Sequence, residues 1–508
     1  MSNFIPSKYQ QALFDWIKTG SGSAVVEAVA GSGKTTSMVQ SLNMIDSKNS
    51  ILFLAFNKSI AEELANRAPK HVKCMTMNAL GHRAVMNQFG RVILDSKKTQ
   101  LILDRMSDAG VISAEDYRLY SFPIKKLVNI AKSVGLAPQS SNKTSLVPDN
   151  METWNRLIDY FDIEIGNSDM SFDLVNNMTE KAIEYTRVAL QMSINETKII
   201  DFNDQLYFPV IYDLPMTKYD WVFVDESQDI SAIQRTMLVK TLKDNGRLVA
   251  VGDPRQAIYG FRGADSDSLN NIAKTFNCIN LPLSISYRCP KAVVKEAQTI
   301  VSHIEASETA PEGLVKTLGL AVPSLFKIND MVVCRNSAPL VQLAYNLISN
   351  KIPAKVMGRD IGEGLVSLVK KLKAKSILEL SVKLEDWKRR ETQRLLKDDP
   401  EANLSKIEDK FDCLNCFIEF SGTDTVDGLI RAIQSMFGEQ SFGTVLLSTI
   451  HKAKGLEAKR VFILDAWRMP SPYAKKPHQR EQEMNLLYVA ITRAQEELYY
   501  VDLPKKAK

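Results

Sequence analysis

A glycine-rich turn near the start of the chain has the residues that a phosphate group needs. The turn GSGKTT over residues 31–36 follows an apolar run over residues 23–29 and precedes a helical pattern. Glycines let backbone N–H groups point inward around phosphate oxygens, and the start of the helix adds positive potential. Lys34 would hold the β- and γ-phosphates of a nucleotide, and Thr35 would ligate Mg²⁺. Ala28 stands at the first glycine of the consensus, but the glycines of the tight turn are present. The expected nucleotide-binding residues here are Ala30, Gly31, Ser32, Gly33, Lys34, Thr35 and Thr36.

Two adjacent acids much further along the chain complement this turn. Asp225 and Glu226 directly follow an apolar run over residues 221–224. Asp225 could hold Mg²⁺, and Glu226 could polarise the water that attacks a γ-phosphate, which favours hydrolysis over transfer to another substrate. Two acids at the end of a strand also occur as a helix N-cap. Their combination with the phosphate turn is what favours a site for ATP and Mg²⁺.

Both groups need elements that bring them together. Short apolar runs that end in loops rich in Gly, Ser, Thr or Asp recur along the chain, with helical patterns between them. This alternation is typical of an open α/β sheet of buried parallel strands, whose ligands lie at the carboxyl ends. We predict strands over residues 23–29, 50–55, 221–224 and 247–251 in the first half, and over 278–283, 331–334, 353–356, 444–448, 460–464 and 497–501 in the second.

Two stretches interrupt the alternation and divide the chain. Residues 96–199 are mostly helical in pattern, and residues 361–440 are rich in Lys, Glu, Asp and Leu. We therefore predict two P-loop-type α/β domains with parallel sheets, each carrying a mainly helical insertion. The first domain comprises residues 1–95 and 200–280, and the second comprises 281–360 and 441–508. Because the second insertion has no residue of the predicted ATP site, we expect ATP hydrolysis to persist without it.

The composition is that of a globular protein and excludes several classes. The 508 residues are 45% hydrophobic, 24% charged and 8% aromatic, which excludes wholesale disorder and fibrous repeats. At about 100–200 residues per domain, three or four domains fit this length. The net charge of +5 is small, so a basic track for nucleic acid would be local. No apolar run is long enough to cross a bilayer and no signal-like segment begins the chain, so we expect a cytoplasmic protein without a membrane partner.

A pair of cysteines has the spacing of zinc ligands. Cys413 and Cys416 form a CxxC, but no second CxxC or histidine pair completes four ligands. A helix turn with two reduced thiols is the alternative interpretation. A disulfide framework is not expected in a large chain without an export signal.

Seven further segments occur in the order of known helicase motifs. In sequence order they are FNKSIA at 56–61, TMNALG at 76–81, DESQ at 225–228, VGDPRQAIYGFRGA at 251–264, LSISYR at 283–288, STIHKAKGLE at 448–457 and EMNLLYVAITRA at 483–494. Together with the phosphate turn, these segments resemble motifs Ia to VI of superfamily 1 DNA helicases of the UvrD/Rep/PcrA group. The first two especially resemble the F-box DNA helicase branch. The chain departs from the usual pattern at Asn78, Ser286 and Phe261, and its second insertion is shorter than the family's; none of these changes removes a catalytic group.

The resemblance implies further roles at the ATP site. Three residues would hold the adenosine part of ATP, by reading adenine, stacking on the base and contacting the ribose: Gln10, Tyr287 and Glu457. Three others would act on the γ-phosphate, two as arginine fingers from the second domain and one as a sensor: Arg288, Arg493 and Gln256. The alternatives are that Gln10 is a surface residue and Gln11 takes its role, that Tyr287 is a core aromatic, and that Arg288 and Arg493 form ion pairs between the domains.

The resemblance also implies a track for single-stranded DNA. Loop aromatics would stack on bases, and polar or basic side chains would contact phosphate or sugar. The stacking residues would be Phe56, Tyr259 and Phe261, and the backbone contacts would be Asn57, Thr76, Arg335, Thr449 and His451. Loop aromatics also occur as small satellite cores.

The implied function is an ATP-dependent helicase that moves 3′→5′ on single-stranded DNA and unwinds duplex junctions in replication, repair or recombination. A translocase that strips proteins from single strands and a non-catalytic, nucleotide-gated DNA clamp are the alternatives. Replication or recombination proteins remain open as partners.

Overall fold

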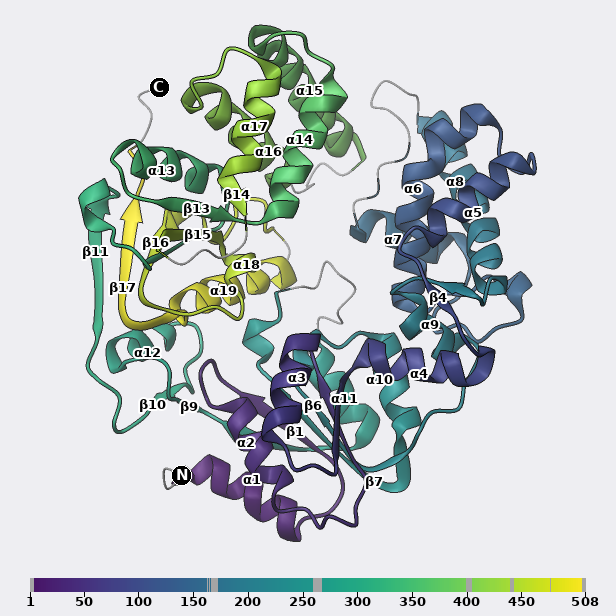
Figure 1. Ribbon diagram of the computed structural model, residues 1–508, viewed down its shortest axis with the longest axis vertical. Helices are drawn as coiled ribbons and strands as arrows, with labels where there is room; N and C mark the ends of the chain where they lie inside the picture. Colours follow the sequence, from purple (N-terminus) through teal and green to yellow (C-terminus); the bar gives the residue numbers. More distant parts are fainter. Residues whose placement is uncertain are drawn as a thin grey trace. The chain divides into compact units, whose positions relative to one another are not determined.

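The computed structural model describes residues 4–161, 163, 165, 172–258, 267–398, 404–438, 443–475 and 477–504. Its contacts divide the chain into two units, each with its own parallel sheet (Figure 1). The first unit comprises Met1–Ala28 and Gly33–Leu283, and the second comprises Val29–Ser32 and Ser284–Lys508. The predicted α/β fold with two parallel sheets is confirmed.

The first unit is built on a six-stranded parallel sheet with the order β3-β2-β6-β7-β1-β8. Its strands are β1 (Ala24–Ala28), β2 (Ile51–Ala55), β3 (Val72–Thr76), β6 (Tyr219–Val224), β7 (Leu242–Gly252) and β8 (Ile279–Leu283). The four strands predicted in the first half are confirmed as β1, β2, β6 and the end of β7. The strand expected over 278–283 belongs to this sheet as well, because β8 pairs with β1.

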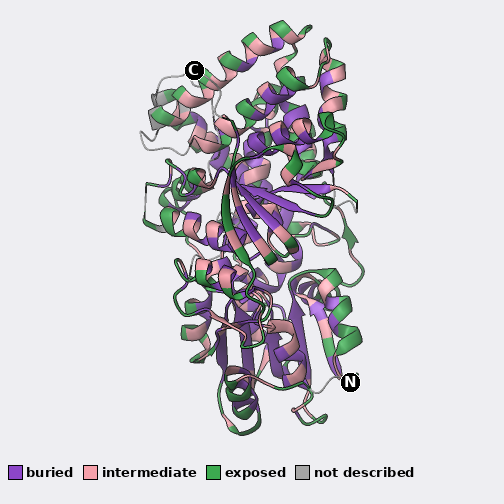
Figure 2. Cartoon of the chain, turned by 90° about the vertical axis from the view of Figure 1, so that its left-hand side faces the viewer, coloured by how far each residue is buried: buried purple, intermediate pink, exposed green. Residues whose placement is uncertain are grey.

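Helices cover both faces of this sheet, because alternate residues of each strand point to opposite sides. Val26 and Phe53 pack on one side, with the helices that follow the first two strands. Val25 and Leu52 belong to the core on the other side. The helices around the sheet are α1 (Lys8–Thr19), α2 (Lys34–Leu42), α3 (Lys58–Arg67), α4 (Met77–Phe89), α9 (Asp204–Ile211), α10 (Ala232–Thr241) and α11 (Ser268–Phe276). Figure 2 shows the strands as the buried layer of the fold.

A helical segment enters and leaves the first unit through two short strands that pair with each other. These strands are β4 (Ile93–Leu94) and β5 (Ile199–Ile200), in parallel register. The helices between them are α5 (Lys98–Asp108), α6 (Ala114–Val134), α7 (Met151–Phe161) and α8 (Phe172–Asn195). The core of this segment is continuous with the core on one side of the sheet, so the segment predicted as helical packs directly on the domain that carries it.

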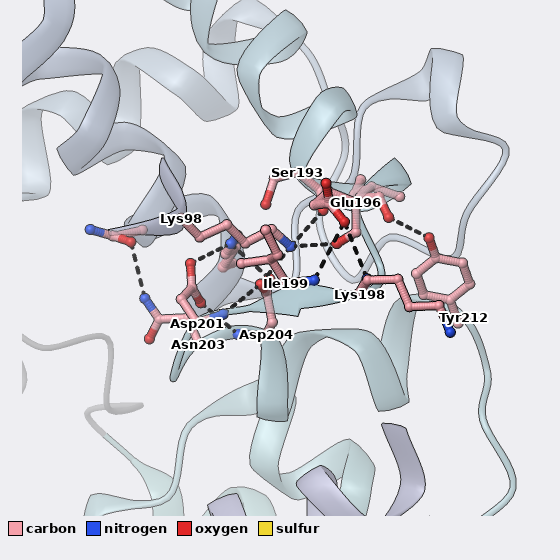
Figure 3. Close-up of polar contacts among 12 residues, drawn as sticks. Lys98, Ser193, Glu196, Lys198, Ile199, Asp201, Asn203, Asp204 and Tyr212 are labelled. Carbon is pink, nitrogen blue, oxygen red and sulfur yellow. Dashed lines mark hydrogen bonds and ion pairs between the residues drawn. The ribbon is translucent and has the colours of Figure 1, made fainter. Parts of the chain in front are cut away.

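Four charged side chains are buried together where this helical segment meets α9, and Figure 3 labels three of them, Lys98, Asp201 and Asp204. The Lys98 ammonium donates to Asp204 Oδ2 at 2.8 Å and to two carbonyls near the end of α8. The Lys132 ammonium, in the last turn of α6, lies 2.6 Å from Asp201 Oδ2 and 2.7 Å from Asp204 Oδ1. Two ammonium groups thus face two carboxylates. This arrangement satisfies the requirement that buried charges be paired.

The second unit has a seven-stranded parallel sheet with the order β11-β17-β16-β12-β15-β13-β14. Its strands are β11 (Leu314–Leu320), β12 (Met331–Cys334), β13 (Ala354–Met357), β14 (Phe437–Gly438), β15 (Val445–Thr449), β16 (Ala458–Leu464) and β17 (Ala494–Asp502). A separate pair joins β9 (Ile285–Ser286) to β10 (Glu305–Ala306). The five strands predicted after residue 330 are confirmed. The two edge strands β11 and β14 were not predicted.

The second unit has helices on its sheet, and those between residues 337 and 436 share one core with it. The helices of this unit are α12 (Lys291–Ala297), α13 (Ser337–Ser349), α14 (Arg359–Leu372), α15 (Ile377–Asp398), α16 (Ser405–Phe420), α17 (Val426–Met436), α18 (Ile450–Ala453) and α19 (Pro477–Ile491). Asp409 on α16 accepts from the Ser337 and Ala338 N–H groups at the start of α13, at 2.7 and 3.2 Å. Phe417 on α16 meets Tyr345 on α13 edge to face at 5.7 Å. The helices α14 to α17, within the stretch predicted as an insertion, therefore contribute to the core of this unit.

Both cysteines of the CxxC lie inside this shared core. Cys413 and Cys416 are buried free thiols on α16, and the Cys416 Sγ lies 3.8 Å from the Ala338 carbonyl oxygen. Their surroundings are apolar side chains of α13 and the sheet. Elsewhere in the fold, no helix within the described ranges combines the length and the apolarity that a bilayer crossing requires.

Candidate functional site

The turn between β1 and α2 has the geometry of a phosphate cradle. Gly31 and Gly33 have φ of 71° and 75°, in the left-handed region that favours glycine. Gly33 precedes the first turn of α2, and its carbonyl accepts from the Ser37 N–H at 2.8 Å. Ser32 is buried, and among the described residues its Oγ has no hydrogen-bond partner. The left-handed glycines, the helix start, the unsatisfied Ser32 hydroxyl and Lys34 together fit a phosphate group.

Two buried carboxylates at the ends of neighbouring strands interact electrostatically with the lysine of this turn. Asp225 follows β6 and Asp253 follows β7. Burial, and then the adjacent Glu226, raise the pKa of Asp225, and Lys34 opposes that rise. Burial also raises the pKa of Asp253, and Lys34 opposes it too. A cation placed beside these oxygens would keep both acids ionised, and carboxylate oxygens are the donors that Mg²⁺ prefers.

A chain of side-chain hydrogen bonds joins the acid pair to the next strand end. The Gln228 amide nitrogen donates to the Glu226 carboxylate, and the Gln228 amide oxygen accepts from the Asp253 N–H at 3.0 Å. Gln256 Nε2 donates to Asp253 Oδ2 at 2.7 Å. Gly252 leaves room for this chain, because a Cβ there would lie 2.5 Å from the Gln228 oxygen. The predicted catalytic Glu226 and sensor Gln256 are thereby brought into one network.

Asp253 lies at the centre of this network, although no role was predicted for it from sequence. The signal was available, since Asp253 follows an apolar run and a glycine in the way that Asp225 follows its own strand. What the pattern could not give was its burial and its position beside Lys34.

The predicted adenine-reading glutamine lies against the helix that follows the phosphate turn. Gln10 is buried on α1, and its Nε2 donates to Ser37 Oγ on α2 at 2.9 Å. Its amide oxygen accepts from the Ser7 N–H at 3.0 Å, as part of a capping box at the start of α1. Gln11, the alternative in sequence, is exposed and bonds to Asp15. The structure brings Gln10 and not Gln11 to α2.

In the second unit, residues from three of the motifs converge. Arg288 Nε lies 2.5 Å from Glu457 Oε2, and its Nη1 donates to the Thr492 carbonyl at 3.4 Å. The neighbouring Arg493 is 1% exposed. Its guanidinium donates to the carbonyls of Val489 and Leu456 at 2.9 and 3.0 Å. Arg288 and Glu457 thus form an ion pair with each other, and Arg493 is oriented by backbone carbonyls. Tyr287 is about half exposed.

Candidate DNA contacts of the first unit lie at the carboxyl edge of its sheet. Phe56 follows β2 and is exposed. Asn57 and Thr76 are the N-caps of α3 and α4, with side chains that accept from backbone N–H groups at 2.9 and 3.1 Å. Ala55 and Thr76 are register partners, so these residues share one edge. The helices α3 and α4 therefore both begin at this edge of the sheet, and helix N-termini attract anions.

An exposed aromatic that was not predicted from sequence lies beside this edge. Phe202 is exposed in the turn before α9, and its carbonyl accepts from Asn78 Nδ2 at 2.9 Å. Asn78 is the residue at which the chain departs from the usual family pattern. The signal in the sequence was a lone aromatic among acids and amides, in residues 201–204.

The predicted DNA contacts of the second unit are placed less uniformly. Thr449 ends β15 and is largely buried, and His451 lies in the following turn of α18. Arg335 forms a two-armed ion pair with Glu483 at 2.8 to 3.0 Å, and both side chains are largely buried. Its guanidinium is therefore occupied by a carboxylate, an interaction that we did not predict. Tyr259 and Phe261 lie outside the described residues.

The chain has clear relatives among known proteins. F-box DNA helicase protein 1 of Schizosaccharomyces pombe is 26% identical over 517 residues, which cover 94% of this chain and 55% of that protein. F-box DNA helicase 1 of Gallus gallus is 23% identical over 500 residues, 92% of this chain and 46% of its own length. The ATP-dependent DNA helicase PcrA of Staphylococcus aureus is 24% identical over 319 residues, 59% of this chain and 40% of that protein. The chain thus spans about half the length of the curated relatives it matches.

Two family models match along the chain. The UvrD/REP helicase N-terminal domain matches residues 10–277, and the UvrD-like helicase C-terminal domain matches residues 149–502. The first match contains the phosphate turn and the carboxylate network, and the second extends through Arg288, Glu457 and Arg493. The first alone covers more than half of the chain. The protein therefore belongs to the UvrD/REP family of superfamily 1 helicases.

Proposed function

We propose that this protein is an ATP-dependent DNA helicase, which hydrolyses ATP to move along single-stranded DNA and to separate duplex strands. The observation that carries the proposal is the hydrogen-bonded network that joins Asp225, Glu226 and Asp253, with which Lys34 of the phosphate turn interacts electrostatically. A nucleotide phosphate and a divalent cation both find their partners at this one edge. The names of the relatives, which are DNA helicases, support DNA as the polymer.

Each group around the phosphate turn has a distinct task in this proposal. The backbone of residues 31–36 and Lys34 bind the β- and γ-phosphates, and Thr35 and Asp225 would hold Mg²⁺. The metal, when bound, would neutralise charge on the phosphate oxygens. Glu226 orients and polarises the attacking water, and Gln228 fixes the Glu226 carboxylate by donating to it. Gln256, anchored on Asp253, is the γ-phosphate sensor.

The proposal also gives residues of the second unit roles in ATP binding and hydrolysis. Arg288 stabilises the charge that develops on the transferred phosphoryl group, which is worth roughly 10³–10⁵ in rate for an arginine finger. Arg493 is the second finger. Because its guanidinium is buried and bonded to carbonyls, we expect its contribution to be smaller than that of Arg288. Gln10, Tyr287 and Glu457 hold adenine and ribose.

In the proposal, each unit contacts single-stranded DNA at the carboxyl edge of its own sheet. In the first unit, Phe56 and Phe202 offer faces for stacking, and Asn57 and Thr76 lie at helix starts suited to phosphates. In the second unit, the contacts are Thr449, His451 and those discussed below. These contacts carry no base-edge recognition, so we expect binding without sequence preference. Movement 3′→5′ and a role in replication, repair or recombination are part of the proposal.

The proposal is tested by measuring ATP turnover with and without single-stranded DNA, followed by unwinding of 3′-tailed and 5′-tailed duplexes. Lys34→Ala should reduce turnover by roughly a hundredfold or more, because phosphate charge loses its partner. Glu226→Gln should bind ATP and DNA but not hydrolyse ATP. Lys48→Ala, at an exposed lysine of the same unit, is the matched control and should behave as wild type.

Three outcomes would count against the proposal. Turnover that DNA does not stimulate would exclude a motor. Wild-type turnover by Glu226→Gln would remove the residue assigned to the water. DNA-stimulated turnover without strand separation on either tailed duplex would favour a translocase that only strips proteins from the strand.

A further inference from the structure

One tryptophan of this chain stands apart from the others by its exposure. Of the five tryptophans, Trp16, Trp154 and Trp221 are at most 9% exposed, and Trp387 is partly buried against the core of the second unit. Trp467 is 63% exposed. The indole is a large apolar surface with a strong tendency to be covered. An exposed tryptophan in an ordered turn is therefore a candidate for ligand contact.

The turn that carries Trp467 is held rigidly by buried interactions. The Arg468 guanidinium lies 4.5 Å from the centre of the Trp467 ring, and Arg468 Nε pairs with Asp465 Oδ2 at 3.0 Å. Asp465 is buried, and its other carboxylate oxygen accepts from the Leu503 N–H at 2.9 Å. Its backbone N–H donates to the Val501 carbonyl at 2.8 Å. The ring and the guanidinium are thus presented together, at little cost in side-chain entropy on binding.

This turn lies at the same edge of the sheet as the predicted DNA contacts of the second unit. Trp467 is in a short 3₁₀ helix, Ala466–Arg468, directly after β16. On the central strand β12, Cys334 is in register with Thr449 of β15 on one side and with Leu464 of β16 on the other. The carboxyl ends of these parallel strands therefore end side by side. Trp467 follows one end and Thr449 forms another.

The turn that carries Trp467 also provides a positively charged side chain at this edge. Arg335, the cation predicted here from sequence, is paired with Glu483 on both arms of its guanidinium. The Arg468 side chain is 30% exposed; it pairs with Asp465 through Nε and also interacts electrostatically with Asp412. Arg468 thus offers the edge a positive group beside a stacking surface. Sites for single-stranded nucleic acid combine an aromatic ring with a cation, since bases stack on aromatic faces and phosphates bind cations.

We propose that Trp467 is an additional base-stacking site for single-stranded DNA in the second unit, with Arg468 bracing the indole and contacting the adjacent phosphate. The inference rests on the proposed DNA-binding function and adds a contact to it. Arg468 covers part of one ring face, and the exposed remainder of the indole takes the base. Every base has a π-face, so this site grips the strand without reading its sequence.

Intrinsic fluorescence gives a direct test, because Trp467 is so much more exposed than the other indoles. In the Trp387→Phe background, oligo(dT) should quench the emission of the full-length protein, since the remaining tryptophans are buried. Trp467→Phe should abolish the quenching but keep affinity for labelled oligo(dT) within about threefold, because a phenyl ring still stacks. Trp467→Ala should weaken affinity about fivefold or more, the loss of one stacked base. Ile328→Ala is the matched control, since this exposed residue precedes β12 at the opposite edge of the sheet.

The outcomes separate this inference from the function on which it rests. If wild-type protein binds oligo(dT) and DNA stimulates its ATP turnover, but Trp467 emission is not quenched and Trp467→Ala binds as tightly as Ile328→Ala, the stacking site is refuted and the helicase proposal stands. If wild-type protein does not bind oligo(dT) at all, both fall. Equal weakening by Trp467→Phe and Trp467→Ala would also refute stacking, because it would indicate loss of a specific indole contact.

Discussion

The buried cluster of Lys98, Lys132, Asp201 and Asp204 should contribute strongly to the free energy of unfolding of the first unit. Lys132→Met removes the ammonium that faces Asp201 at 2.6 Å and Asp204 at 2.7 Å, and leaves two buried carboxylates with Lys98 alone. Breaking a buried pair in this way typically costs about 3–5 kcal/mol, because an uncompensated charge stays behind. We expect a loss of stability in that range.

The contacts of the two lysines rank them as targets. Burial, together with the Lys132 ammonium, lowers the pKa of Lys98, and Asp204 opposes that lowering. For Lys132, burial is opposed by both Asp204 and Asp201, and the pKa is raised. Lys132 contacts both carboxylates, whereas Lys98 contacts the Asp204 carboxylate alone. Lys132→Met should cost more than Lys98→Met.

A second variant separates charge balance from packing. Lys132→Met/Asp201→Asn returns the cluster to zero net charge and leaves the Lys98–Asp204 pair. The oxygen of the new side-chain amide can still accept from the Asp204 N–H, as Asp201 Oδ1 does at 2.9 Å. Replacement of a whole buried pair is often close to neutral, so the double variant should recover at least half of the loss.

Urea unfolding, followed by far-ultraviolet circular dichroism, measures these differences. With a slope near 3 kcal/mol per M, Lys132→Met should lower the midpoint of the first unit by about 1 to 2 M. Lys181→Met is the control, because Lys181 pairs with Asp116 on the same helical segment but is 43% exposed; such pairs contribute about 0–1 kcal/mol. A midpoint for Lys132→Met equal to that of the control, or a double variant no more stable than the single, would refute the reasoning.

Three further changes test other parts of the structure. Hydrogen bonds from Lys243 and Ser50 lower the pKa of Asp220 to about 2, so the contribution of Asp220 to stability is present above about pH 4 and is lost as the pH falls through 2. In urea unfolding, wild type should therefore lose about 1 kcal/mol more stability between pH 6 and pH 3 than Asp220→Asn does. An equal loss in the two proteins would contradict the assigned pairing. Arg335→Met should lower the melting temperature, because Glu483 is left buried and unpaired, while the dependence of DNA affinity on salt stays the same; a salt slope reduced by about 0.7 would instead make Arg335 a phosphate contact. Replacement of residues 363–440 by a Gly/Ser linker should unfold or aggregate the second unit, because α13 loses its cap and its packing on α16. Circular dichroism and limited proteolysis measure this loss of structure. A folded variant with DNA-stimulated ATPase activity would instead support the expectation from sequence that ATP hydrolysis persists without this segment.

The candidate ATP site shows how far local pattern carries. The phosphate turn and the acid pair were predicted from a few consecutive residues each, because backbone conformation in a Gly-rich turn and the end of an apolar strand are set locally. Asp253 has the same local pattern but gained its role from its position next to Lys34. That proximity depends on which strands are neighbours in the sheet, and strand order is a long-range property.

The sequence by itself determined the family, the alternation of strands and helices, and the residues of the phosphate turn, because hydrophobic period and motif spacing are written in consecutive residues. Only the tertiary structure decided how side chains far apart in sequence pair. It placed Glu483 on Arg335, Glu457 on Arg288 and Asp204 between two lysines. It also decided that residues 361–440 share the core of the second unit and that Trp467 is left exposed. Burial and charge pairing depend on every element packed around a side chain, and no window of the sequence contains those elements together.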